Sequence, residues 1–167
     1  GKTTGWIGYT LSWTNRRFDN INFGEWYPYK FDRRHDFSLV ISHKFNEKWD
    51  IGATWVYGTG NALTFPQGAY LGMPHSNPWN EQLSVEFVES YGSRNSTRLP
   101  AYHRLDFAVN KHSKKQKWES TWSLGAYNLY NRKNPWFAYL AYEDNQRVAK
   151  QVSLFPIIPS ISYRIQF

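Results

Sequence analysis

The chain has 167 residues, a formal net charge of +7 and no cysteine, and 19% of its residues are aromatic. Without cysteine, a disulfide framework, a thiolate metal site and a cysteine nucleophile are excluded. The mean hydropathy of −0.68 and the lack of a run of about 18 apolar residues exclude a transmembrane helix, and the dispersed basic residues argue against a nucleic-acid partner.

Six segments of the sequence alternate apolar and polar residues, which is the pattern of a strand with one apolar face. In chain order they are residues 4–14, 34–45, 49–58, 101–111, 117–130 and about 157–167. Five of them are about 10–12 residues long and residues 117–130 are slightly longer, which is enough for a tilted strand to cross a bilayer. The alternation therefore predicts an all-β protein whose strands are apolar on one side only.

The final segment shows this alternation most clearly. Its apolar face carries Ile161, Tyr163, Ile165 and Phe167, opposite serine, arginine and glutamine. An ending of this kind is typical of an outer-membrane β-barrel, in which the last strand also acts as the assembly signal. We therefore expect these four residues to form the C-terminal assembly signal, with the apolar face toward lipid and the polar face toward a wet lumen.

The connections between the segments alternate in length. Residues 46–48 and 112–116 make short connections, whereas residues 15–33, 59–100 and 131–156 make long ones. Short turns on one side and long loops on the other are typical of outer-membrane barrels, and a β-sandwich lacks this alternation. The pattern predicts periplasmic turns and extracellular loops.

The last long connection contains strand signals of its own. Residues 136–142 and 148–155 are rich in aromatic and apolar residues and flank a polar turn at 143–145. They predict two further strands that continue above the membrane. Pro156 and Pro159 lack a backbone N–H and should kink the ladder where the final strand begins.

Six strands are too few to close a barrel, since the smallest bacterial barrels have about eight. An open sheet in lipid would leave two edges of unpaired backbone groups, each costing several kcal/mol. We therefore expect residues 1–167 to be a single piece of a larger barrel, without an internal domain boundary. The sequence opens on Gly1 and Lys2 rather than on a start methionine or a signal peptide, which predicts a mature or truncated piece.

The aromatic residues fall into two predicted groups. The strands carry candidates for an aromatic girdle, at the depths where amphipathic rings settle: Trp49, Trp55, Tyr57 and Trp118. The long loops carry rings that could stack on a ligand, grip a partner lipoprotein or pack on each other: Trp26, Tyr27, Tyr29, Trp79 and Tyr91.

No catalytic site, metal site or cofactor is expected. Arg104 and Asp106 should point to one face and pair along a hydrophilic barrel wall rather than perform acid–base work. The five histidines lie on separate elements without metal-binding spacing. His43 and Ser120 fall on apolar faces, but nothing in the sequence places them together as the Ser/His pair of a membrane hydrolase.

Six stretches carry a resemblance to a known family. They are YTLSWTNRRF at 9–18, YPYKFDRRHD at 27–36, WVYGTGN at 55–61, RLPAYHRLD at 98–106, YNLYNRKNP at 127–135 and SLFPIIPSISY at 153–163. Together they resemble the C-terminal part of TonB-dependent outer-membrane receptors of the Bacteroidetes type, over essentially the whole chain. That family implies a barrel of about 22 strands, plugged by an N-terminal domain. This chain would supply about six C-terminal strands, without the plug or the TonB box.

The resemblance also implies a location and a set of partners. The location is the bacterial outer membrane, and the whole protein would import a bulky nutrient such as a siderophore, vitamin, glycan or peptide. The partners are outer-membrane lipids and lipopolysaccharide, the rest of the barrel and its plug, TonB through the missing N-terminal part, the barrel assembly machinery and a surface lipoprotein lid.

Three other interpretations stay open. A smaller barrel could act as an adhesin or as a subunit of a complex. A C-terminal barrel fragment could be held by the assembly machinery through its final strand. A soluble β-sandwich could bind carbohydrate, but that interpretation must explain why alternate residues are apolar on every strand.

Overall fold

The structure is a computed structural model that describes residues 1–73, 75–76, 83–84, 87–144 and 146–167. Its regular structure is β-strand, apart from a short 3-10 turn at Asn22–Gly24, so the predicted all-β class is confirmed. No helix in these ranges has the length and apolar character that crossing a membrane requires.

Contacts between residues divide the chain into two compact units. Unit 1 comprises Gly1–Ser12, Arg33–Gly60 and Leu99–Phe167, and it contains the six long strands. Unit 2 comprises Trp13–Asp32 and Asn61–Arg98, which belong to two of the long connections between those strands.

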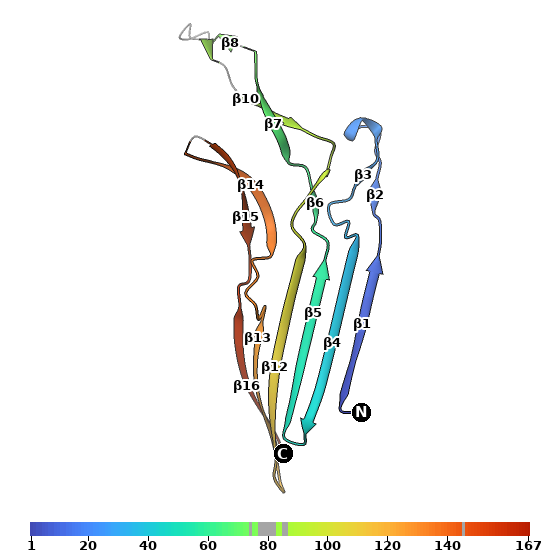
Figure 1. The fold of residues 1–167 in the computed structure, drawn as a ribbon, viewed down its shortest axis with the longest axis vertical. Helices are drawn as coiled ribbons and strands as arrows, with labels where there is room; N and C mark the ends of the chain where they lie inside the picture. Colours follow the sequence, from blue (N-terminus) through green and yellow to red (C-terminus); the bar gives the residue numbers. More distant parts are fainter. Residues whose placement is uncertain (74, 77–82, 85–86, 145) are drawn as a thin grey trace. The chain divides into compact units, whose positions relative to one another are not determined.

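Unit 1 is built on a six-stranded antiparallel sheet with the order β1-β4-β5-β12-β13-β16 (Figure 1). The strands are β1 (Thr3–Leu11), β4 (His35–Asn46), β5 (Trp49–Gly58), β12 (Tyr102–Lys114), β13 (Glu119–Tyr127) and β16 (Ile158–Gln166). Each overlaps a segment that the alternation predicts as a strand. The sheet is open, and β1 and β16 are its edges among the described residues.

The register of the sheet brings the apolar sides of all six strands onto one face. Leu39 of β4 lies opposite Ile7 of β1 and Trp55 of β5. Leu124 of β13 lies opposite Val109 of β12 and Ile161 of β16. Because side chains alternate with a period of two, a shift of one residue in any pair would turn that strand's apolar side chains to the other face.

Several strand boundaries differ from those that the sequence predicts, and β13 covers Glu119–Tyr127 rather than residues 117–130. β1 ends at Leu11 rather than at residue 14. β12 runs to Lys114, so its turn to β13 spans residues 115–118 rather than 112–116. Residues 112–116 are polar and read as a turn, but backbone pairing needs no apolar side chain. Lys114 therefore still faces Glu119, with 2.6 Å between Nζ and Oε1.

The strands predicted inside the last long connection are present. β14 (Pro135–Glu143) and β15 (Gln146–Ser153) pair as an antiparallel hairpin in unit 1. Asp144 in the turn has a φ of 47°, a left-handed conformation that aspartate tolerates better than most residues. A register shift next to Pro135 marks the place where the ladder lacks an N–H donor.

Unit 2 consists of short two-stranded ribbons. They are β2 (Asn15–Arg16) with β3 (Tyr27–Pro28), β6 (Ala62–Leu63) with β11 (Thr97–Arg98), β7 (Pro66–Leu71) with β10 (Phe87–Tyr91), and β8 (His75–Ser76) with β9 (Leu83–Ser84). Its buried side chains include Tyr27, Ala62 and Asp32.

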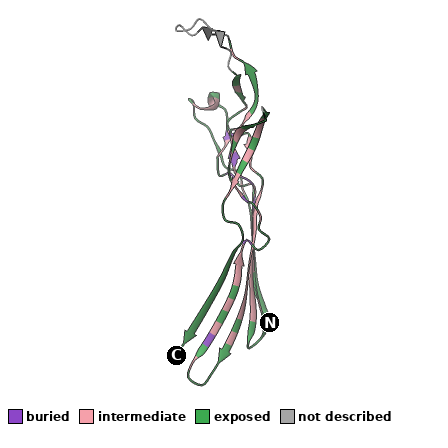
Figure 2. Ribbon diagram, turned by 90° about the vertical axis from the view of Figure 1, so that its left-hand side faces the viewer, coloured by how far each residue is buried: buried purple, intermediate pink, exposed green. Residues whose placement is uncertain are grey.

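Burial is low along the six-stranded sheet. Figure 2 shows the long strands as mainly intermediate or exposed. Ser120 is the one buried side chain other than glycine in the six strands, all of which are described. Among the described residues of unit 1, no further strand packs on either face of the sheet, although domains normally bury an apolar sheet face against a second layer.

Candidate membrane-facing surface

The apolar side of the six-stranded sheet is a continuous surface, called the apolar face below. Its central residues are Ile7, Tyr9, Phe37, Leu39, Ile41, Ile51, Ala53, Trp55, Leu105, Phe107, Val109, Trp122, Leu124, Ala126, Ile161 and Tyr163. Ile7, Leu124 and Ile161 are 69%, 63% and 71% exposed. An exposed apolar patch that extends across six strands marks a surface for a membrane or for another protein.

The apolar face is almost free of formal charge. Among the residues of the six described strands that point to this side, Lys111 is the only Asp, Glu, Lys or Arg. It lies opposite Trp49, near the short turns, with its Nζ 5.5 Å from the centre of the Trp49 ring. A charge at the margin can extend its ammonium group to water, whereas one at the centre could not.

Three histidines on the apolar face lie at its two ends, and each has a ring nitrogen within hydrogen-bond distance of a hydroxyl group. His43, near the short turns, bonds Thr3 with 2.7 Å between Nδ1 and Oγ1. At the opposite end, His35 Nδ1 lies 2.9 Å from Tyr9 Oη. His103, also at that end, bonds the hydroxyl of Tyr130 at 2.7 Å. These pairs satisfy the polar atoms that border the apolar centre.

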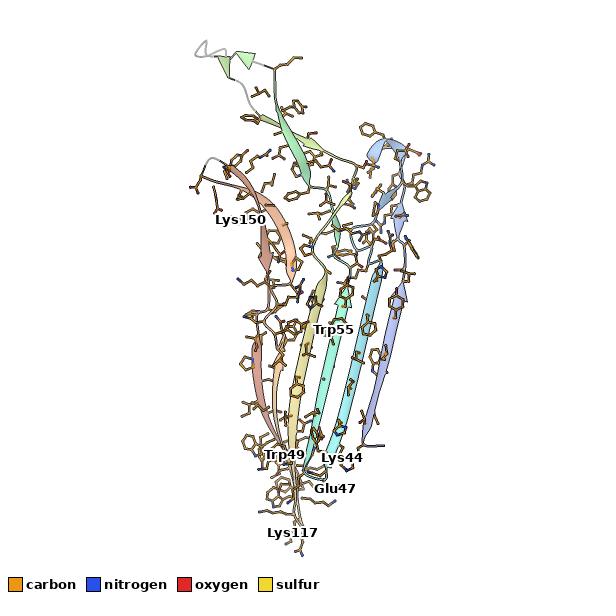
Figure 3. All side chains as sticks on the ribbon, in the orientation of Figure 1. Lys44, Glu47, Trp49, Trp55, Lys117 and Lys150 are labelled. Carbon is orange, nitrogen blue, oxygen red and sulfur yellow. The ribbon has the colours of Figure 1, made fainter. Side chains whose placement is uncertain are left out.

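Three of the four predicted girdle residues lie on β5. Trp49 is the first residue of this strand, and Trp55 lies further along it (Figure 3). Tyr57 stacks on Trp55, with ring centres 6.2 Å apart. The fourth, Trp118, lies in the turn before β13 rather than in the strand, and Lys115 Nζ is 4.9 Å from its ring centre. Aromatic residues therefore occur at both ends of the apolar face.

The predicted assembly-signal residues follow one side of β16. Tyr163 pairs with Trp122 of β13, with ring centres 4.6 Å apart. Ile161 and Ile165 lie opposite Leu124 and Ser120. Phe167 follows the end of the strand and is 92% exposed.

The reverse side of the sheet, called the polar face below, carries ion pairs and hydrogen bonds. Arg104 bonds Asp106, with 2.8 Å between Nη2 and Oδ2, which confirms the predicted pairing. The same guanidinium donates to the hydroxyls of Tyr102 at 3.0 Å and Tyr127 at 2.6 Å. Four polar side chains from two strands thus satisfy one another.

A second polar cluster lies closer to the short turns. Asp50 of β5 accepts a hydrogen bond from Asn110 Nδ2 at 2.6 Å and pairs with His112 Nε2. The other ring nitrogen of His112 lies 2.9 Å from the hydroxyl of Thr121 on β13. The cluster joins three neighbouring strands, and its members are satisfied by one another.

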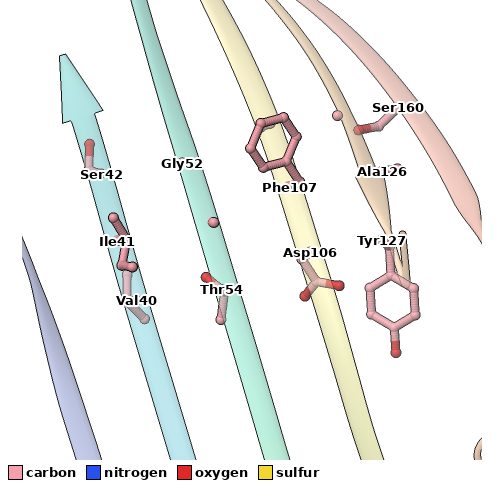
Figure 4. A pocket seen from close by; sticks show the side chains of 13 residues that line it. Val40, Ile41, Ser42, Gly52, Thr54, Asp106, Phe107, Ala126, Tyr127 and Ser160 are labelled. Atoms are coloured by element: carbon pink, nitrogen blue, oxygen red, sulfur yellow. The ribbon is translucent and has the colours of Figure 1, made fainter. Parts of the chain in front are cut away.

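Between these two clusters the polar face has a hollow of about 450 Å³ (Figure 4). A row of small residues crosses the sheet there: Ser42, Gly52, Ala108, Gly125 and Ser160. A Cβ atom built on Gly52 would have no heavy atom within 4 Å. The polar face therefore has room for side chains that another element would bring.

A smaller cavity of about 250 Å³ lies beside the Arg104 cluster, at the base of the β14–β15 hairpin. Its lining is rich in rings that could stack on a ligand. The lining residues are Tyr102, Tyr127, Asn134, Pro135, Trp136, Leu154 and Phe155. The residues come from four separate segments, so no local pattern could have revealed the cavity.

The β13–β14 connection is anchored by Asn128, which is fully buried. Its Nδ2 donates to the carbonyls of Arg132 at 2.9 Å and Phe155 at 3.1 Å. Its Oδ1 accepts from the N–H of Arg132 at 3.0 Å, and its φ is 52°. Asparagine adopts this left-handed conformation more readily than other non-glycine residues.

Two substitutions at position 128 should distinguish the contribution of the Asn128 side chain to stability from that of its backbone conformation. We expect Asn128→Gly to lower the free energy of unfolding by about 2 kcal/mol, because it leaves buried carbonyls unpaired. Asn128→Ala should cost about 1 kcal/mol more, because alanine is strained at positive φ. Urea unfolding in detergent measures both values. An equal loss of unfolding free energy in both variants would mean that the positive φ at position 128 does not affect stability.

The predicted loop contacts differ in their exposure. Trp26 is 64% and Tyr91 is 54% exposed, so both rings are accessible. Tyr27 is 5% exposed and packs inside unit 2. Tyr29 lies under Arg16, whose Cζ is 3.7 Å from the ring centre. Trp79 lies outside the described residues.

Two observations concern the histidines and acidic residues in the part of the chain that the structure describes. No group of three or more His, Asp or Glu side chains there could hold a metal ion. His43 and Ser120 lie on β4 and β13, with two strands between them. No protein-family model, curated protein or solved structure matches the chain.

Proposed function

We propose that the chain forms part of the wall of an outer-membrane β-barrel, and that the whole protein is a TonB-dependent transporter of a bulky nutrient. The observation that carries the proposal is the apolar face: six long strands turn uncharged apolar side chains outward and polar side chains to the reverse. Barrel strands in a membrane have this division, since one side meets lipid and the other meets the lumen.

The dimensions of the apolar face support a membrane as its partner. From His103 to Lys111, β12 rises about 27 Å at about 3.4 Å per residue. With a tilt of about 40°, this length spans about 21 Å along the membrane normal, close to the apolar band of about 25 Å in such barrels. The histidines and aromatic residues at both ends lie where interfacial side chains settle.

The open edges of the sheet support a larger barrel. In lipid, the outward-facing N–H and C=O groups of β1 and β16 would lack partners, at a cost of several kcal/mol each. Pairing with further strands of the same barrel removes that cost. The transport activity itself rests on the family resemblance and on the hollowed polar face, which could receive the plug and line the path of the nutrient.

The intact native polypeptide provides the test. Because about 22 strands and a plug need a long chain, we expect a mass of roughly 80–120 kDa and extraction from membranes only with detergent. A native polypeptide of about 20 kDa would contradict the transporter and favour a smaller barrel. A protein that is monodisperse in plain buffer would contradict any membrane barrel.

Tryptophan at neighbouring positions 52 and 53 should show whether the hollow receives the plug. Gly52→Trp adds a large ring to the polar face, and we expect it to displace the plug and lower the Tm of the full-length protein in detergent. Overpacking costs about 1–3 kcal/mol. Ala53→Trp places the same ring on the apolar face and should leave Tm unchanged. Equal Tm values for both variants would mean that nothing packs against the hollow.

A further inference from the structure

A further cavity of unit 1 lies between the β13–β14 connection and the end of β15, and it shares Leu154 and Phe155 with the cavity beside the Arg104 cluster. Its volume is about 390 Å³, within the usual range for small-molecule sites of about 300–1,000 Å³. It is lined by Asn131, Arg132, Lys133, Gln151, Ser153, Leu154, Phe155 and Pro156. This lining contains two cations and no carboxylate.

The cations differ in how they are held. Arg132 is fixed, because its Nη2 donates to Ala101 O at 2.9 Å and its backbone N–H to Asn128 at 3.0 Å. Its Nε is buried and has no hydrogen-bond partner in the described part of the chain. Lys133 is exposed and forms no ion pair with a described residue, so its ammonium group can turn toward the cavity.

The neutral part of the lining is preorganised. Gln151 Nε2 donates to Lys133 O at 2.8 Å and to Ser153 Oγ at 3.0 Å. Phe155 has a φ of 55°, an uncommon conformation for a bulky residue. Its carbonyl accepts the bond from Asn128 that holds this backbone in place. Leu154, Phe155 and Pro156 then form an apolar wall beside the two cations.

We propose that this cavity binds a phosphate monoester whose remaining part is apolar or a sugar. Arginine and lysine are the side chains that recognise phosphate most strongly, the first by its fork of donors and the second as a point charge. The phosphate could belong to a membrane lipid headgroup or to a soluble phosphorylated compound, and the cavity chemistry is the same for both. A lipid ligand requires the membrane location of the proposed function, whereas a soluble ligand does not.

The test compares three probes on the full-length protein: phosphatidic acid and phosphatidylcholine in detergent micelles, and glucose 6-phosphate in solution. Native mass spectrometry measures the lipids, and calorimetry measures the sugar phosphate. The variants are Lys133→Gln and Arg132→Gln. Lys117→Gln is the matched control, because this exposed lysine lies in the turn at the opposite end of the strands.

We expect phosphatidic acid, glucose 6-phosphate or both to bind, with Kd at least tenfold higher in Lys133→Gln and unchanged in Lys117→Gln. Phosphatidylcholine, a phosphate diester that carries a choline cation, should bind more weakly. Since Arg132→Gln also removes a bond to Ala101, Lys133→Gln carries the decision if the arginine variant fails to fold. Phosphatidic acid binding alone assigns a lipid headgroup, and glucose 6-phosphate binding assigns a soluble ligand even if the membrane proposal fails. The proposed site would be wrong if neither substitution changed the Kd, or if phosphatidylcholine bound as tightly as phosphatidic acid.

Discussion

Arginine at position 39 is expected to prevent assembly in a membrane, whereas arginine at position 38 is expected to be tolerated. Leu39 lies midway along the apolar face of β4, between Ile7 and Trp55 on the neighbouring strands. An arginine at the bilayer midplane costs about 2–4 kcal/mol in a barrel strand. Ser38 points to the polar face, opposite Gly8 and Val56, where the same side chain would meet the lumen.

The measurement is the amount of folded full-length protein in the outer membrane, read from its heat-modifiable mobility on a gel. Leu39→Arg should give little folded protein, and Ser38→Arg should give nearly the amount of the unmodified chain. Similar yields from both variants would mean that the apolar face does not meet lipid. If only Ser38→Arg lost folded protein, the assignment of the two faces would be reversed.

Loss of the Asp32 carboxylate is expected to loosen unit 2 without affecting the long strands. Asp32 is fully buried and forms an ion pair with Arg98, which also donates to its backbone carbonyl at 2.6 Å. Its Oδ1 accepts the N–H of Thr14 at 2.6 Å. Removing one partner of a buried ion pair typically costs about 3–5 kcal/mol. The side chain of Arg98 is 28% exposed and can regain some hydration, so about 3 kcal/mol is expected for Asp32→Ala.

Hydrogen exchange on the full-length protein measures this effect locally. Amides in residues 13–32 and 61–98 should exchange faster in Asp32→Ala, while those of β5 and β12 should not. The matched control is Asp36→Ala, because Asp36 pairs with Arg33 at 3.4 Å with both side chains nearly half exposed. Exposed pairs contribute about 0–1 kcal/mol. Equal acceleration by both substitutions would contradict a structural role for the buried pair.

The long strands and their faces could be predicted from sequence because a strand repeats every two residues. Alternation over about ten residues specifies both the element and the side on which each residue lies, as for Ile161, Tyr163 and Ile165. The Arg104–Asp106 pair was predictable for the same reason, since residues two apart share a face. Strand ends were harder to predict, and Trp118 belongs to a turn because backbone pairing stops before it.

The candidate cavities and the loop unit could not be predicted in this way. The partner of Asp50 is His112, and the partner of Asp32 is Arg98, residues far apart in the chain. The sequence marks Tyr27 only as an aromatic loop residue, although its ring is buried. The hydrophobic periodicity within one segment does not predict such contacts, because they depend on how separate segments are brought together.

By itself, the sequence determined an all-β chain with six strands that are apolar on one side, since hydrophobic alternation is a local property. Only the tertiary structure decided how those sides align. The register joins them into one uncovered apolar face, and the β13–β14 connection places Arg132 and Lys133 beside Phe155. The physical reason is that register and loop contacts follow from hydrogen bonds between distant segments, which no single segment encodes.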